Sequence, residues 1–143
     1  MSRGHSWCSE HGDRSSPYAA ILGVSIEAED GAPPILVMPF ANDVVGRPGF
    51  LHGGAISGLL EVAAIAALYH ALNAEGGDGA SARIKPVNVT VDFMRGGRDK
   101  PTRAAGVVTR LGTRVANVEA TAWQDERDKP IAAARMNYLI VRD

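Results

Sequence analysis

The sequence predicts an α+β fold in which an antiparallel sheet of about six strands wraps around one long central helix. Residues 53–75 form one long apolar run, and after it the period of the pattern changes from 3.6 to two. No other segment has the length and period of a second core helix. We therefore expect neither parallel crossovers nor a helical layer on the outer face of the sheet.

The first elements are a short helix and a hairpin. Residues 17–23, PYAAILG, predict a turn of helix, and residues 24–30 and 34–40, VSIEAED and PILVMPF, predict two strands. The glycine and prolines at 31–34 predict a turn between these strands, so we expect them to pair antiparallel. A loop rich in Asn, Gly and Pro, residues 42–50, then leads to the long helix.

The long helix is predicted to begin near Gly53 and to end at Gly76 and Gly77. Apolar residues surround most of its circumference, so we expect other elements to cover it on most sides. Glu61 interrupts the apolar run near its middle, and many of the other residues are small. These features favour the core helix of a soluble protein over a membrane span.

Four strands are predicted after the helix. In residues 87–93, Val and Phe alternate with polar residues, which predicts a strand whose apolar face packs against the helix. Three more strand segments follow, separated by a turn at Gly112 and by a charged turn over residues 125–130. Their sequences are TRAAGVVTRL, RVANVEATAWQ and IAAARMNYLIV.

The composition fits one soluble domain. The chain has 143 residues, and its 15 basic and 16 acidic residues give a net charge of −1, so charge favours neither nucleic acid nor an anionic membrane as a partner. The single cysteine, Cys8, cannot form an internal disulfide, which favours the reducing cytoplasm. Residues 1–16 predict a flexible arm before a single domain at 17–143. His5, Cys8 and His11 lack a fourth ligand, so no metal site is predicted.

Glu61 is the only formally charged residue between His52 and Glu75. An unpaired buried carboxylate loses several kcal/mol of hydration free energy. An acid in this apolar helix is therefore expected to have a function that offsets this cost. The segment His52-Gly53-Gly54 places the exposed N–H groups of a helix N-terminus about two turns before the acid. Such donors beside a lone carboxylate are typical of a site that attacks a carbonyl group.

Three segments resemble hotdog-fold thioesterases of the PaaI and 4-hydroxybenzoyl-CoA thioesterase type. The segment GFLHGG at residues 49–54, followed by an acid nine residues after the histidine, resembles the start of their central helix. VTVDFMR at 89–95 resembles the strand after that helix, and TRLGTR at 109–114 resembles the turn before the last long hairpin. The resemblance spans residues 18–141 and implies the hotdog fold.

The resemblance implies hydrolysis of an acyl-CoA thioester to a free acid and CoA at the interface of two subunits. Glu61 is then the nucleophile or the general base, and both routes stay open. The Gly53 N–H, helped by the helix dipole, binds the carbonyl oxygen as it gains charge. Because thiolate is a good leaving group, no metal and no cofactor are expected, and coenzyme A is part of the substrate.

The acyl group is expected between the helix and the strand at 87–93. For coenzyme A, the arginines near the turns at Gly96-Gly97 and Gly112, together with Lys100, carry charges that suit phosphates. A solvated basic surface is the alternative. The predicted coenzyme A-binding residues are Gly54, Arg95, Gly96, Arg98 and Arg114.

Each catalytic assignment has a structural alternative. Glu61 could instead pair with an arginine such as Arg47 across an interface. His52, placed in the catalytic set, is expected to orient the loop by hydrogen bonds rather than to transfer a proton. Gly53 and Gly54 could serve only tight packing where the helix begins.

An oligomer is expected, because one helix cannot bury both faces of the sheet and long edge strands must pair or be covered. A two-fold homodimer that joins the sheets edge to edge would bring Glu61 near Gly53 of the partner subunit, and a dimer of dimers, a homotetramer, is also open. Gly58 is expected to allow a close helix or subunit contact. Tyr69 and His70 are interpreted as interface or sheet contacts.

Two positions depart from the family pattern. Gly46 stands six residues before the histidine, where many relatives place Asn or Gln, and Ile65 stands one turn after the acid, where some carry Ser or Thr. These departures keep open a non-catalytic acyl-CoA-binding or regulatory hotdog protein. A hotdog dehydratase or hydratase needs a histidine farther upstream in the loop, and the nearby histidine is His52 itself, so the sequence argues against that activity.

Overall fold

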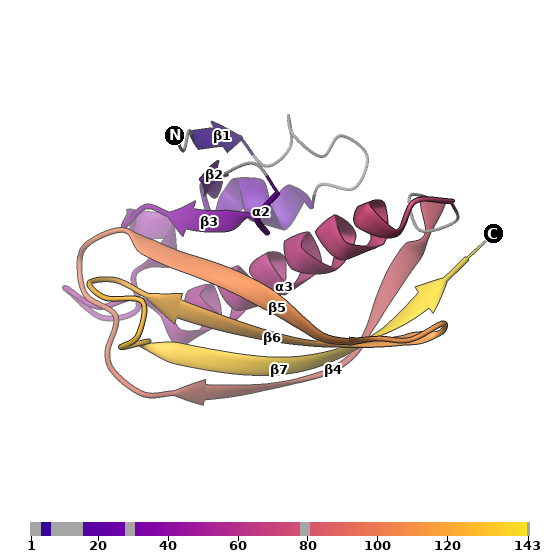
Figure 1. The fold of residues 1–143 in the computed structure, drawn as a ribbon. Coiled ribbons are helices and arrows are strands. Elements are labelled where there is room, and N and C mark those ends of the chain that lie inside the picture. Colours follow the sequence, from indigo (N-terminus) through magenta and orange to yellow (C-terminus); the bar gives the residue numbers. More distant parts are fainter. Residues whose placement is uncertain (1–3, 7–15, 28–30, 78–80, 143) are drawn as a thin grey trace.

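The computed structural model describes residues 4–6, 16–27, 31–77 and 81–142. The sheet curves around the long helix α3 (Figure 1). The described elements, in chain order, are β1 (Gly4–Ser6), α2 (Pro17–Ile21), β2 (Ser25–Glu27), β3 (Ile35–Met38), the 3-10 helix η2 (Asn42–Val44), α3 (Gly53–Glu75), β4 (Arg83–Phe93), β5 (Thr102–Leu111), β6 (Val115–Trp123) and β7 (Ala132–Val141).

The strands form one antiparallel sheet in the order β1-β2-β3-β5-β6-β7-β4. All six predicted strands are present, and β1 adds a seventh beside β2. The predicted hairpin is confirmed, since Ile26 of β2 stands opposite Leu36 of β3. The observed architecture, one long helix on an antiparallel sheet, is the hotdog fold.

The predicted bounds of α3 are confirmed. His52 is the N-cap, and the chain leaves the helix at Gly76, whose φ of 72° lies in the left-handed region that favours glycine. The apolar residues around α3 are buried, and its leucines form much of the core with side chains from the sheet. Among these core residues are Leu59, Leu60, Leu68, Leu72, Leu36, Met38, Val118 and Met136.

Small residues let α3 lie close to β5. A Cβ added to Gly106 of β5 would lie 2.8 Å from the Cβ of Ala67 and 2.9 Å from the carbonyl oxygen of Ala63, which is closer than real Cβ atoms come. The helix therefore touches the strand almost backbone to backbone at this point. The alanines of α3 that raised its apolar content in the sequence are the residues that permit this packing.

The prediction that the apolar face of β4 packs against the helix is confirmed only in part: Val91 on this face is half-buried and packs against the core. Val89 and Phe93 stand opposite Met136 and Ala132 of β7, which are buried on the helix side of the sheet, so both pairs share that side. Val89 and Phe93 nevertheless remain 49% and 56% exposed. Because β4 is an edge strand and α3 lies mainly over β5, β6 and β7, the helix covers only part of this face.

The predicted flexible arm over residues 1–16 falls mostly outside the described residues, which leave out 1–3 and 7–15. Within it, residues 4–6 form β1 and pair with β2. Cys8 and His11 lie outside the described residues as well. Among the described residues, no group of three or more His, Cys, Asp or Glu side chains could hold a metal ion.

By length and hydropathy, α3 is the one helix among the described residues that could cross a membrane. Its most apolar 18-residue window is 67% buried inside the protein. The apolar character of α3 is thus accounted for by the sheet that wraps around it, as in the core helix of a soluble protein.

Candidate active site

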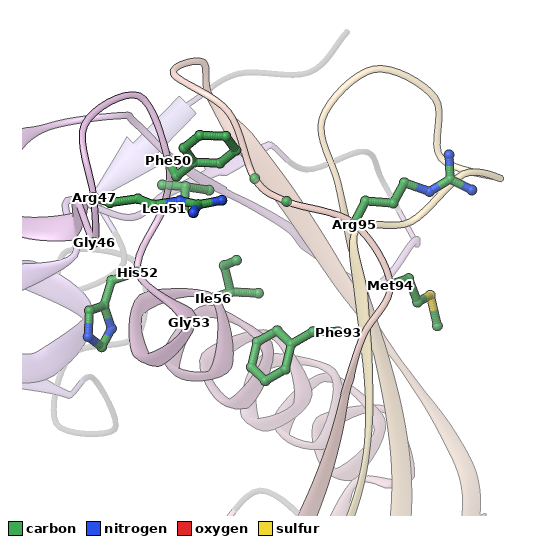
Figure 2. Close-up of a pocket in the computed structure, with 12 residues that line it drawn as sticks. Gly46, Arg47, Phe50, Leu51, His52, Gly53, Ile56, Phe93, Met94 and Arg95 are labelled. Atoms are coloured by element: carbon green, nitrogen blue, oxygen red, sulfur yellow. The ribbon is translucent and has the colours of Figure 1, made fainter.

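A cavity of about 620 Å³ lies at the N-terminus of α3, between the loop before the helix and the end of β4 (Figure 2). Its volume falls within the range of small-molecule sites. Apolar side chains, three arginine or histidine side chains and four glycines form its wall: Gly46, Arg47, Phe50, Leu51, His52, Gly53, Ile56, Phe93, Met94, Arg95, Gly96 and Gly97.

Backbone hydrogen bonds fix the loop that leads into α3. The Leu51 N–H donates to the Gly97 carbonyl oxygen at 2.9 Å, and the His52 N–H donates to the Val44 carbonyl oxygen at 2.8 Å. A Cβ at Gly97 would lie 2.6 Å from Cδ1 of Leu51, so only glycine allows this approach. The start of α3 is thereby tied to the loop after β4, and both segments line the cavity.

His52 caps the helix. Its Nδ1 accepts a hydrogen bond from the Gly54 N–H at 2.8 Å, which requires that Nδ1 carry no proton. Figure 2 shows the imidazole pointing away from Ile56 and Phe93, toward the outside of the loop. In this geometry His52 orients the first turn of the helix.

The two glycines after His52 differ. The Gly53 N–H is the first of α3, where a helix leaves its donors without intrahelical partners, and no acceptor for it is found among the described residues. The Gly54 N–H is occupied by His52. Of these two glycines, Gly53 lines the cavity with a free N–H, whereas Gly54 does not line the cavity.

Glu61 lies two turns farther along α3 and is half-buried. It does not line the 620 Å³ cavity of the single chain. Among the described residues no cation lies within ion-pair distance of Glu61, and the guanidinium of Arg47 lies over the Phe50 ring at 4.2 Å from its centroid. The pairing of Glu61 with Arg47 is thus not seen within one chain.

Tyr138 of β7 lies close enough to Glu61 to feel its charge. Burial raises the pKa of the Tyr138 hydroxyl, and the negative charge of Glu61 raises this pKa further. The hydroxyl donates to Sδ of Met136 at 3.1 Å. Tyr138 also lines a smaller cavity of about 140 Å³, whose wall includes Val62 and Ile65, one and four residues after Glu61 on α3.

Gly58 allows the close helix contact that its position predicts. A Cβ at Gly58 would lie 2.5 Å from Cε2 and 2.6 Å from the hydroxyl oxygen of Tyr18, so the Tyr18 ring of α2 rests on the backbone of α3. Of the other two helix residues, Tyr69 is buried and His70 is half-buried.

Gly46 packs closely against the loop. A Cβ at Gly46 would lie 3.0 Å from the Cα of His52, tighter than most real contacts. A larger residue at this position would need the loop to move. An Asn or Gln at position 46 would therefore need His52 to move by a few tenths of an ångström.

The predicted phosphate-binding residues fall into two groups. Arg95 and Gly96 line the cavity beside Gly53, and Arg98 lies nearby, over the Phe50 ring at 4.6 Å from its centroid. Lys100 is paired with Asp125, with Nζ 2.6 Å from Oδ1.

Arg114 is separated from this group. It stands at the hairpin between β5 and β6, where β6 begins opposite Leu139, whereas Arg95 follows Phe93, which is opposite Ala132. These are the two ends of the sheet. One chain therefore does not bring Arg114 to the cavity that Arg95 lines, and Arg114 lines a different cavity of about 400 Å³.

A family model described as the thioesterase superfamily matches residues 48–131, more than half of the 143 residues. The chain belongs to the thioesterase superfamily. The segment that the superfamily model matches contains every predicted site residue from His52 to Arg114. None of the curated proteins compared matches the chain.

Solved structures carry the same fold. A Chromobacterium violaceum protein is 31% identical over 87% of this chain and 83% of that chain, with a TM-score of 0.66. A thioesterase from Haemophilus influenzae is 17% identical, with 90% and 85% covered and a TM-score of 0.72. A Bacillus halodurans protein solved with CoA is 16% identical, with 94% and 82% covered and a TM-score of 0.69.

In this member of the thioesterase superfamily, the structure adds aromatic residues that sequence reasoning did not assign. Phe93 lies beside Gly53, Tyr138 lies beside Glu61, and Tyr18 covers Gly58. The contact at Gly58 could be predicted from the sequence, because a glycine inside a helix often lets another residue pack against the helix backbone. The other two contacts depend on the register between strands, for which the sequence carries no local signal.

Proposed function

We propose that this protein is an acyl-CoA thioesterase whose active site forms between two subunits. The observation that carries the proposal is the unpaired Gly53 N–H at the edge of the 620 Å³ cavity, in a chain of the thioesterase superfamily. A donor fixed at a helix N-terminus suits a carbonyl oxygen that gains negative charge during the reaction.

The proposal uses two subunits because one chain leaves the site incomplete. Glu61 lies outside the cavity, and the 11-residue edge strand β4 exposes apolar side chains on the helix side of the sheet. Pairing of two β4 strands about a two-fold axis would cover these side chains. Such a pairing runs the two α3 helices in opposite directions, which brings Glu61 of the partner subunit toward Gly53.

In the proposed reaction the thioester carbonyl oxygen accepts a hydrogen bond from the Gly53 N–H. The Glu61 carboxylate either attacks the carbonyl carbon, which expels the CoA thiolate and leaves a mixed anhydride for water to hydrolyse, or removes a proton from a water that attacks instead. Both routes give a free acid and CoA. The charge on the oxygen in the transition state is what Gly53 stabilises.

Arg95 and Arg98 are proposed to contact the phosphates of coenzyme A, because the first lines the cavity and the second lies beside it. The Bacillus halodurans protein solved with CoA supports a CoA-type ligand for this fold. Arg114 could join them only from another subunit, since it stands at the other end of the sheet.

A thiol-release assay across short, long and aromatic acyl-CoA esters tests the proposal. Wild-type protein is expected to release CoA thiol, and Glu61→Gln is expected to lower kcat by about 10²-fold or more, because the amide can neither attack nor accept a proton. Glu119→Gln, an exposed acid on the outer face of β6, is the matched control and is expected to keep full activity. Equal activity in wild type and Glu61→Gln would exclude the assigned role.

The second candidate is an acyl-CoA-binding protein without turnover. It is favoured by Gly46, which lacks the polar side chain that many relatives carry and whose close contact with His52 disfavours a larger residue. It predicts that wild-type protein binds acyl-CoA tightly in calorimetry while releasing no thiol from any ester of the panel.

A further inference from the structure

Phe93 occupies an unusual position at the proposed site. It ends the edge strand β4 on the helix side of the sheet, opposite the buried Ala132 of β7. Figure 2 shows its ring turned toward Ile56 and the first turn of α3, whereas the next side chain, Met94, points away. A large aromatic side chain that faces the core side would ordinarily be covered, yet Phe93 is 56% exposed.

The ring of Phe93 borders the free donor. A Cβ at Gly53 would lie 3.5 Å from Cζ and 3.6 Å from Cε1 of Phe93, so the tip of the ring is in van der Waals range of Gly53. Apart from Gly53 itself, its chain neighbours and the adjoining helix backbone, no other described atom lies within 4 Å of that point. Phe93 is therefore the side chain from another element that borders Gly53 on this side.

We propose that Phe93 is a specificity-determining residue that limits the width of the acyl group next to the thioester carbon. This inference rests on the proposed function, in which the carbonyl oxygen lies about 2.9 Å from the Gly53 nitrogen. The first carbons of the acyl chain then pass alongside the Phe93 ring. An unbranched chain fits beside the ring, and a chain branched at its second carbon meets it.

The test compares two isomeric substrates, butyryl-CoA and isobutyryl-CoA, which differ only in the branch at the second carbon. Phe93→Ala is expected to shift the ratio of their kcat/KM values toward the branched substrate by about tenfold or more. One extra methyl group in an apolar pocket changes kcat/KM by a factor of this size. Phe93→Leu, which keeps an apolar side chain, is expected to lie between wild type and Phe93→Ala. Val107→Ala, equally exposed but on the outer face of β5, is expected to leave the ratio unchanged.

Two results would overturn the inference: an unchanged ratio in Phe93→Ala, or an equal shift in Val107→Ala. Light scattering of each variant shows whether its oligomeric state is kept, and Phe93→Leu keeps the test valid if the alanine variant does not fold. If wild-type protein hydrolyses neither of these esters nor any ester of the wider panel, the proposed function fails. The affinities for S-butyl-CoA and S-isobutyl-CoA thioethers, measured by calorimetry, then decide the role of Phe93 by the same ratio.

Discussion

Gly53 and Gly54 are neighbours with different reasons to be glycine. A Cβ at Gly54 would lie 2.9 Å from Nδ1 of His52, so a side chain there displaces the helix cap. A Cβ at Gly53 would lie 3.5 Å from the nearest atom, which is an ordinary contact. Alanine at 54 therefore displaces the His52 ring from its capping position, whereas packing tolerates alanine at 53, which leaves room for a substrate as the reason for Gly53.

Gly53→Ala is expected to lower activity, whereas Gly54→Ala is expected to lower stability. Gly53→Ala should leave the free energy of unfolding unchanged or raise it by up to about 1 kcal/mol, because alanine reduces the freedom of the unfolded chain. It should lower kcat/KM by about 10²-fold, because the new methyl group displaces the carbonyl from the donor. Gly54→Ala should lower the free energy of unfolding by about 0.5–2 kcal/mol through loss of the cap.

Urea unfolding and thiol release on the same preparations check both expectations. A Gly53→Ala variant that unfolds as easily as Gly54→Ala would show that Gly53 serves packing. A fully active Gly53→Ala variant would remove the reason to place the carbonyl oxygen at this N–H.

Among the secondary-structure elements, the short strand β2 carries an ion pair that reaches across the sheet. Glu27 of β2 accepts two hydrogen bonds from Arg103 of β5, at 3.1 Å from Nε and 2.7 Å from Nη2, and this contact crosses over β3. The hydrogen bonds from Arg103 and its positive charge lower the pKa of Glu27 below its ordinary value of 4.5, against the opposing effect of burial. The pair therefore adds side-chain contacts to a strand of only three residues.

The stability from this pair should depend on pH. Because the pKa of Glu27 is lower in the folded protein, its contribution is present above about pH 4.5 and is lost as pH falls through the folded pKa. Glu27→Gln should lower the free energy of unfolding at pH 7 by a few tenths to about 1 kcal/mol. The value is small because the Arg103 side chain is 37% exposed and solvent screens the pair.

Urea unfolding of both proteins at pH 7 and pH 3 measures this difference, which should shrink at pH 3. Glu126→Gln is the matched control. It breaks an ion pair with Lys129 in which both side chains are more than half exposed, so it should change stability little at either pH. A Glu27→Gln effect that is equal at the two pH values would exclude the ionised pair as its cause.

For the molecule as a whole, the unpaired edge of β4 is the feature that demands a partner. Val89 and Phe93 leave apolar surface open on the side of the sheet that α3 occupies elsewhere. Residues of the same strand that point to the outer face, such as Thr90 and Asp92, are polar. The strand therefore has one apolar face that its own helix leaves partly open, and in the proposed dimer a second copy of this chain covers it.

Val89→Glu and Thr90→Glu place the same charge on opposite faces of β4. Val89→Glu should give a folded monomer with little thiol-release activity, because a carboxylate would be buried in the subunit interface. Thr90→Glu, opposite Arg135 on the outer face, should remain a dimer. Light scattering at micromolar concentration measures both, and a monomeric wild-type protein would contradict the shared site.

The order and bounds of the elements were predictable because each depends on local patterns. The apolar run and the glycine pair marked α3 to within its observed ends, and the period of two marked β5, β6 and β7. The partly open apolar face of β4 shows the limit of this reasoning. Alternation tells that one face of a strand is apolar, but not whether the covering partner is the chain's own helix or another subunit.

The amino-acid sequence determined which segments become helix or strand and which residues carry reactive groups. Hydrophobic periodicity, the glycines that end a helix and a single acid in an apolar segment are all local properties of the sequence. Three-dimensional packing settled which of these residues meet. It placed Gly53, Arg95 and Phe93 around one cavity, set Glu61 apart beside Tyr138, and sent Arg114 to the far end of the sheet. Contacts between distant segments follow from strand register and helix placement, and these are fixed by the sum of core contacts rather than by any local pattern.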